Sequence, residues 1–126
     1  MAKNCLCGSS EYISFSCSGA SDLGQVSDLV ARKLRDDGTR KMNCLAMVAA
    51  ADQKSIDDFK TMNILAIDGC PLDCAKKILV RNGITEFAHL RLTDLGYEKG
   101  KTGTSPEIVN AIVTHAQTIS EVTTYS

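Results

Sequence analysis

The feature that most constrains the fold of this chain is an uninterrupted apolar segment followed by a tight turn. Residues 64–67 carry no polar side chain, and Asp68-Gly69-Cys70-Pro71 comes directly after them. Such a run, bounded by turn residues, is typical of a strand that is buried on both faces, as in parallel sheets. Pro71 suits the first turn of a helix. We therefore expect a buried strand over 63–67 that leads directly into a helix.

Two further strands and a series of helices surround this segment. Residues 12–16 and 86–92 alternate in polarity, which predicts strands. Helices are predicted where apolar residues recur at helical spacing, with caps at Ser21 or Asp22, Asn43, Ser55 and Ser105 and a stop at Gly38. The expected helices cover 22–37, 44–51, 55–59, 71–82 and 106–119. A short strand near Met42 is an alternative for the start of the second helix.

The alternation of strands and helices predicts the fold class. Strand–helix–strand units require right-handed crossovers and a parallel sheet. A chain of 126 residues fits one domain with a real core. We therefore expect a single α/β domain over residues 1–126. Its small, mainly parallel sheet should carry helices on both faces, in a three-layer α/β/α arrangement of the Rossmann-like kind.

Four cysteines stand where predicted elements end or begin. Cys17 follows the first strand, Cys70 follows the buried strand, and Cys44 begins a helix. Cys74 comes one helical turn after Cys70. In parallel sheets, sites form beyond the carboxyl ends of the strands. We therefore expect these thiols to converge at one edge of the sheet.

Thiolates are soft ligands, and four of them complete a tetrahedral site for Zn²⁺ or hold an iron–sulfur cluster. The alternative is that Cys44 and Cys74 are small buried hydrophobic residues. Cys5 and Cys7 precede the first strand. They either join the site, bind metal weakly, or have no role in it.

Other candidate groups are weaker. Gly100-Lys101-Thr102 resembles the end of a phosphate-binding loop, but Leu95 stands where that motif needs its leading glycine. Lys99 and Lys101 remain candidates to lie over an anion. Asp68 either orients the thiols or accepts backbone N–H bonds in its turn. His89 and His115 are expected to be structural.

Composition limits the partners and the compartment. The net charge is -1, with 14 basic and 15 acidic residues and no tryptophan, so no nucleic acid is expected. No apolar run approaches the ~18 residues of a membrane span. The first residues include Lys3 and then Cys-Leu-Cys-Gly, without an apolar signal region. We therefore expect a cytoplasmic protein, in which cysteines serve metal or redox chemistry rather than disulfides.

The segment from Asp68 to Lys77, Asp-Gly-Cys-Pro-Leu-Asp-Cys-Ala-Lys-Lys, resembles the core of the DGC-domain family, which is named for its first three residues. Cys17-Ser18-Gly19 and the segment 41–46, Lys-Met-Asn-Cys-Leu-Ala, are similar to that family's pattern as well. The family is described as zinc-binding through four cysteines. Carried over by position, the resemblance implies the ligands Cys17, Cys44, Cys70 and Cys74 and a zinc cofactor. It implies no particular reaction.

Three functions follow from these observations. The first is a small cytoplasmic metal-binding protein, rather than an enzyme, with a four-cysteine zinc site. The second is a thiol redox or sensor protein in which Cys70 is an activated thiolate and Cys17, Cys44 or Cys74 resolves it. The third is a protein that handles a soft metal or metalloid. A metal ion is the partner that the sequence predicts, and no protein partner follows from it.

Overall fold

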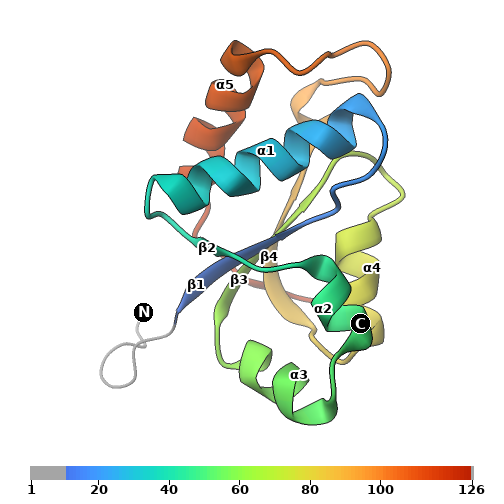
Figure 1. The fold of residues 1–126 in the computed structure, drawn as a ribbon, viewed down its shortest axis with the longest axis vertical. Helices are drawn as coiled ribbons and strands as arrows, with labels where there is room; N and C mark the ends of the chain where they lie inside the picture. Colours follow the sequence, from blue (N-terminus) through green and yellow to red (C-terminus); the bar gives the residue numbers. More distant parts are fainter. Residues whose placement is uncertain (1–10, 126) are drawn as a thin grey trace.

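The computed structural model describes residues 11–125, and within them a five-stranded sheet forms the centre of the fold (Figure 1). Its strands run in the order β2-β1-β3-β4-β5. The first four are parallel and β5 is antiparallel to β4. The strands are β1 (Tyr12–Ser16), β2 (Lys41–Met42), β3 (Asn63–Asp68), β4 (Glu86–Arg91) and β5 (Thr123–Thr124). The prediction of a mainly parallel α/β sheet is confirmed.

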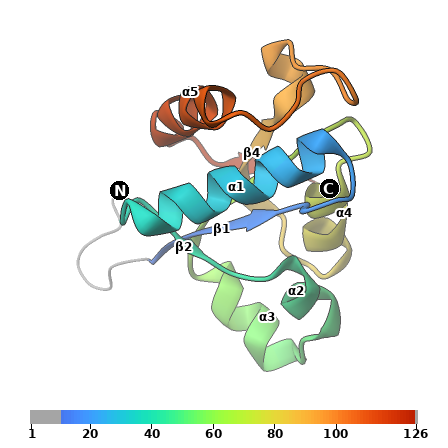
Figure 2. The same ribbon diagram turned by 45° about the horizontal axis from the view of Figure 1, so that its top comes forward.

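The helices cover both faces of this sheet (Figure 2). Two of them, α1 and α5, pack on one face, while α2, α3 and α4 pack on the other. The helices are α1 (Asp22–Asp36), α2 (Leu45–Ala50), α3 (Gln53–Lys60), α4 (Cys74–Arg81) and α5 (Pro106–Gln117), with a 3₁₀ turn η1 (Leu92–Leu95). In the described part of the chain, no helix has the length and apolarity needed to cross a membrane.

The central strand β3 shows why its sequence lacks polar side chains. Leu65 and Ile67 pack under α1 and α5. Ile64 and Ala66 face the opposite layer, with α2, α3 and α4. Because side chains alternate along a strand, both sets are buried only when both faces are covered. Each of these four residues is at most 1% exposed.

Several helix starts differ from the sequence prediction. Ser21 and Ser105 cap α1 and α5 as expected, each accepting a backbone N–H. The N-cap of the third helix is Asp52 instead of Ser55, because the Asp52 carboxylate accepts the N–H of Ser55. The second begins after Cys44 instead of Asn43. A short strand and a helix both occur around Met42, so the two alternatives there coexist.

The largest shift concerns α4, which begins at Cys74 and not at Pro71. Residues 70–73 form a turn closed by the Asp73 N–H and the Cys70 carbonyl, 3.1 Å apart. Asp73 then adopts a left-handed conformation with φ 52°. The prediction that the helix includes Pro71 and Leu72 is wrong, since both precede α4 and Leu72 is 58% exposed. Cys70 therefore lies in a turn before the helix, not on its first turn.

Candidate functional site

The topology brings the four predicted cysteines to the carboxyl edge of the sheet. Cys17 directly follows β1, and Cys70 follows β3 by two residues. Cys44 follows β2 by two residues and is the N-cap of α2, while Cys74 is the first residue of α4. β1 and β3 are neighbours whose following connections run to opposite sides, to β2 and to β4. This is the switch point at which doubly wound sheets place their ligands.

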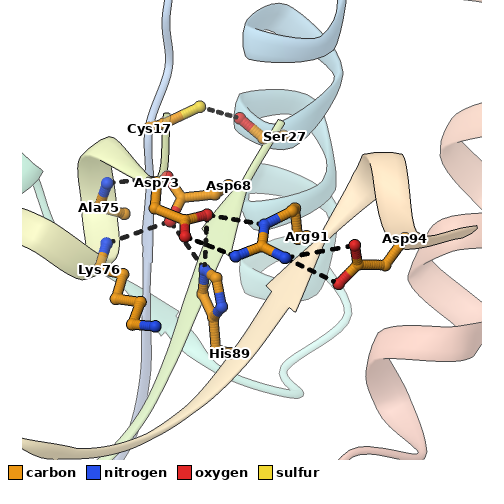
Figure 3. Close-up of polar contacts among 9 residues, drawn as sticks. All are labelled: Cys17, Ser27, Asp68, Asp73, Ala75, Lys76, His89, Arg91 and Asp94. Carbon is orange, nitrogen blue, oxygen red and sulfur yellow. Dashed lines mark hydrogen bonds and ion pairs between the residues drawn. The ribbon is translucent and has the colours of Figure 1, made fainter. Parts of the chain in front are cut away.

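The thiols differ in their surroundings. Cys17 is half-buried, and its Sγ lies 3.2 Å from the Ser27 hydroxyl on α1 (Figure 3). Cys70 is also half-buried, and its Sγ lies 3.9 Å from the Lys99 ammonium. Cys44 and Cys74 are exposed free thiols, so the alternative that they are buried hydrophobic residues is wrong. Cys5 and Cys7 lie outside the described residues.

The donor set fits a soft metal in chemistry and in placement, but the sulfurs are not gathered at ligand distance. A tetrahedral zinc site with Zn–S bonds of ~2.3 Å needs sulfurs about 4 Å apart. Within residues 11–125, the group of three or more ligand atoms within 4.8 Å of one another is formed by Asp68, Asp73 and His89, not by thiols. Closure of a four-cysteine site therefore requires the cysteine side chains to move closer together.

Asp68, the first residue of the Asp-Gly-Cys turn, ties β3 to the start of α4 (Figure 3). Its carboxylate accepts the Ala75 N–H at 2.8 Å and the Lys76 N–H at 3.1 Å. It also contacts the His89 Nε2 at 2.8 Å. The side chain is 1% exposed. Of the two roles considered from sequence, the structure shows the acceptance of backbone N–H groups, because the buried carboxylate satisfies N–H groups that the first helical turn leaves free.

Asp73 is held from the other side by Arg91 on β4. The guanidinium donates to both Asp73 oxygens, with Nε at 2.8 Å from Oδ1, and also contacts Asp94. The hydrogen bond from Arg91 lowers the pKa of Asp73, although burial opposes that shift. The same hydrogen bond, which Arg91 donates to Asp73, raises the pKa of Arg91. Asp68, Asp73 and His89 thus already use one another, Arg91 and backbone N–H groups as partners, so this cluster is a structural network rather than an open cation site.

Gly69, the second residue of the turn, allows a close approach to α1. A Cβ at this position would lie 2.8 Å from the Leu23 carbonyl carbon and 2.9 Å from its Cβ. A Cβ at Gly24 would lie 2.4 Å from the Gly19 oxygen, so the loop that follows Cys17 packs equally closely on α1. Gly69 and Gly24 therefore leave room for both cysteine-bearing loops to pack closely against the first turn of α1.

Sequence reasoning missed Ser27 and Arg91 as neighbours of the site. Ser27 lies four residues after Leu23, on the apolar face of α1, and is fully buried. A serine among the apolar residues of a helix indicates that its buried hydroxyl has a polar partner, which here is the Cys17 sulfur. Arg91 gave no such signal, because alternating charged residues are common on partly exposed strands. His89 was expected to be structural, and its contact with Asp68 agrees with that expectation.

Comparison with known proteins identifies one family model and one curated protein that are similar to this chain. The family model described as the DGC domain matches residues 13–116. The "Anaerobic and virulence modulator AnvM" of Pseudomonas aeruginosa strain PAO1 is 33% identical over 86 residues, which are 68% of this chain and 66% of that relative. The chain thus spans just under two thirds of the length of the curated relative it matches. No solved structure matches the chain. The family match includes strands β2, β3 and β4, β1 from Ile13 onward, the Asp-Gly-Cys turn and all four edge cysteines, and this chain belongs to the DGC-domain family.

Proposed function

We propose that this protein binds one soft metal ion, zinc first, through Cys17, Cys44, Cys70 and Cys74. The observation that carries the proposal is topological. The adjacent strands β2, β1 and β3 each lead, at the same edge, into a cysteine, and the fourth cysteine begins the next helix. Four thiols placed in this way form a donor set that prefers zinc, copper(I) or iron–sulfur clusters over hard cations.

The charges around the thiols support this assignment. Four thiolates and one Zn²⁺ would carry a net charge of about -2, which nearby cations offset. Lys99 lies against Cys70. This cation can stabilise negative charge at the sheet edge.

The bound ion would supply a cross-link between the two layers of helices. In this proposal, Cys17 and Cys70 are already positioned by their half-buried loops, while Cys44 and Cys74 close on the ion from α2 and α4. Zinc itself undergoes no redox change, so the role is structural or in metal handling rather than in electron transfer. We place the protein in the cytoplasm, where thiols stay reduced.

Elemental analysis of the full chain, purified without oxygen, tests the proposal. We expect about one zinc per chain, and a loss of metal in each of Cys17→Ser, Cys44→Ser, Cys70→Ser and Cys74→Ser. Cys5→Ser is the matched control and should keep its metal. Iron with labile sulfide in place of zinc would indicate a cluster. Metal content that is equal in wild type and in all four serine variants would refute the site.

A second candidate function is a thiol redox or sensor role for Cys70. The contact between its sulfur and the Lys99 ammonium favours this role, because a neighbouring cation stabilises a thiolate. The redox role and the metal site predict different metal content and different thiol reactivity in protein purified under reducing conditions. Rapid alkylation confined to Cys70, in a protein that purifies without metal, would support the redox role. One bound zinc with thiols that do not react supports the metal site.

A further inference from the structure

Asp22 at the start of α1 holds a loop from the far end of the chain. Its carboxylate accepts the backbone N–H groups of Gly100 at 2.8 Å, Thr102 at 3.0 Å and Gly103 at 3.1 Å. It also accepts the N–H of Leu23. The hydrogen bond from Gly100 is the largest of the effects that lower the pKa of Asp22 to about 2. One side chain thus fixes a segment that lies 78 to 81 residues further along the chain.

The loop is also closed upon itself. The Glu98 N–H donates to the Thr102 hydroxyl at 2.9 Å, and that hydroxyl donates to the Glu98 carbonyl at 2.7 Å. Gly100 and Gly103 have φ of +82° and +73°, which other residues adopt only with strain. Residues 98–103 therefore form a defined turn, here called the strap, and Asp22 anchors it to α1.

The strap reaches the thiol edge through Lys99. The Lys99 ammonium lies 3.9 Å from the Cys70 sulfur. Within the described residues, Lys99 forms no ion pair with a carboxylate, whereas Lys101 in the same strap pairs with Glu98 at 3.4 Å. Figures 1 and 2 place the strap, the β1–α1 loop and the β3–α4 turn along one side of the molecule. From the sequence, Lys99 was a candidate to lie over an anion, and in the structure the group beside its ammonium is the Cys70 sulfur.

We propose that Asp22 latches the strap across the thiol edge, so that the strap limits access to Cys70 and holds the Lys99 charge against its sulfur. The proposal rests on the proposed function in one respect, which is that the Cys70 thiol takes part in that function, as a metal ligand or as a reactive group. Asp22 is then a positioning residue that acts through Lys99. Neutral molecules would be hindered at Cys70, and small molecules carrying a negative charge would be favoured over neutral ones.

Alkylation of metal-free, reduced full-length protein at pH 7 tests both the limited access to Cys70 and the charge that Lys99 places beside its sulfur. Iodoacetamide is the neutral probe and iodoacetate the anionic probe of similar size, and tandem mass spectrometry assigns the modification to Cys70. The iodoacetate-to-iodoacetamide rate ratio reports the charge at the sulfur. Hydrogen exchange of the Gly100, Thr102 and Gly103 amides reports the latch. The first readout would not change if Lys99 had only a structural role.

For Lys99→Gln we expect the rate ratio to fall by roughly fivefold, with the strap amides still protected. Lys99→Arg should keep the ratio, and Lys101→Gln is the matched control that should also keep it. For Asp22→Ala we expect exchange of the strap amides to rise by roughly tenfold or more. The same variant should react several-fold faster with iodoacetamide and show the lowered ratio of Lys99→Gln. The double variant should lower the ratio no further.

Several outcomes would overturn the proposal. Equal ratios in wild type and Lys99→Gln, or equal reductions in Lys99→Gln and Lys101→Gln, would show that Lys99 does not act on Cys70 in particular. Unchanged amide exchange and alkylation in Asp22→Ala would refute the latch. If Asp22→Ala does not fold, Asp22→Asn takes its place, and the Lys99 variants stand on their own. Metal content tests the proposed function separately, so a failure of the latch and a failure of the metal site can be distinguished.

Discussion

At the scale of single residues, the Asp-Gly-Cys turn combines three different physical roles. Asp68 is a buried carboxylate that accepts the N–H groups at the start of α4. Gly69 leaves the space into which the Leu23 backbone of α1 packs. Cys70 presents a half-buried sulfur to the strap. The first two residues thus fix the place of the third, which explains why the three stand together.

Replacing Asp68 by Ala should lower the free energy of unfolding by about 2–4 kcal/mol, because the Ala75 and Lys76 N–H groups and the His89 ring lose a buried acceptor. Urea unfolding measures this change. Asp57→Ala is the control, since this exposed carboxylate makes only surface contacts, with Lys60 at 3.7 Å and with the Gln53 amide at 2.9 Å, and its loss should alter stability by less than about 0.5 kcal/mol. Equal stabilities of the two variants would contradict the assigned role of Asp68.

Replacing Gly69 by Ala should destabilise the protein by about 1–3 kcal/mol, because the new methyl group would overlap the Leu23 backbone. Gly19→Ala in the neighbouring loop is the matched control. Its Cβ would meet only the Gly24 Cα at 4.0 Å, so no loss of stability is expected. Thermal or urea unfolding of both variants checks this pair. A Gly69→Ala protein as stable as Gly19→Ala would show that α1 can shift away from the turn at little cost.

At the scale of elements, the start of α4 depends on groups that are distant in sequence. Pro71 and Leu72 carry a helix-start pattern, yet they form a turn, because β3 ends at Asp68 and that carboxylate meets the N–H groups of Ala75 and Lys76. Arg91 on β4 then holds Asp73 in its left-handed conformation. The helix is therefore positioned jointly by β3 and β4, and Cys74 with it.

The strap should respond to acid through Asp22, whose folded-state pKa is lowered from 3.8 to about 2. A lowered folded-state pKa adds stability above the unfolded pKa, and this stability is lost as the pH falls through the folded value. Wild type should therefore be more stable than Asp22→Asn above about pH 4, and the difference should vanish as the pH approaches 2. Urea unfolding between pH 2 and 5 measures this difference.

An independent measurement follows the same group directly. The amide NMR shifts of Gly100, Thr102 and Gly103 should titrate together with a midpoint near 2, since all three donate to the Asp22 carboxylate. A common midpoint near 3.8, the ordinary value for Asp, would contradict the latch.

At the scale of the whole molecule, the strand order determines where chemistry can occur. The order β2-β1-β3-β4 places the carboxyl ends of β1 and β3 side by side, with their connecting helices α1 and α4 on opposite faces. Two separate apolar layers, one on each face, hold this arrangement together. Among the residues that the structure describes, the fully buried members of both layers include no cysteine, so the fold should persist without metal.

Metal removal should therefore lower the melting temperature without unfolding the domain. Metal at 100-fold above Kd stabilises the folded state by about 2.7 kcal/mol, which is about 10 °C for a domain of this size. Differential scanning calorimetry of wild type with and without a chelator measures the shift. Cys70→Ser should melt near the chelated wild type and respond little to the chelator. A chelator effect of the same size in both proteins would place any bound metal elsewhere.

The local structure could be predicted from the sequence because it depends on neighbouring residues. The apolar run of β3 implied burial on both faces, and helical periodicity with Ser21 and Ser105 located α1 and α5. The alternation of elements predicted the parallel sheet, and from it the common edge of Cys17 and Cys70. These conclusions need only periodicity, capping chemistry and the handedness of crossovers.

Only the tertiary structure could decide which distant groups meet. Asp68 faces His89 across 21 residues, and Asp22 faces Gly100 across 78. Such contacts depend on the strand order, which periodicity and capping patterns do not specify. The sequence by itself therefore determined the layers, the sheet type and the edge that carries the thiols. The three-dimensional packing decided where α4 begins, which carboxylate accepts which N–H group, and that the sulfur of Cys70 lies beside Lys99, because each of these requires two chain segments to be brought together by the folded core.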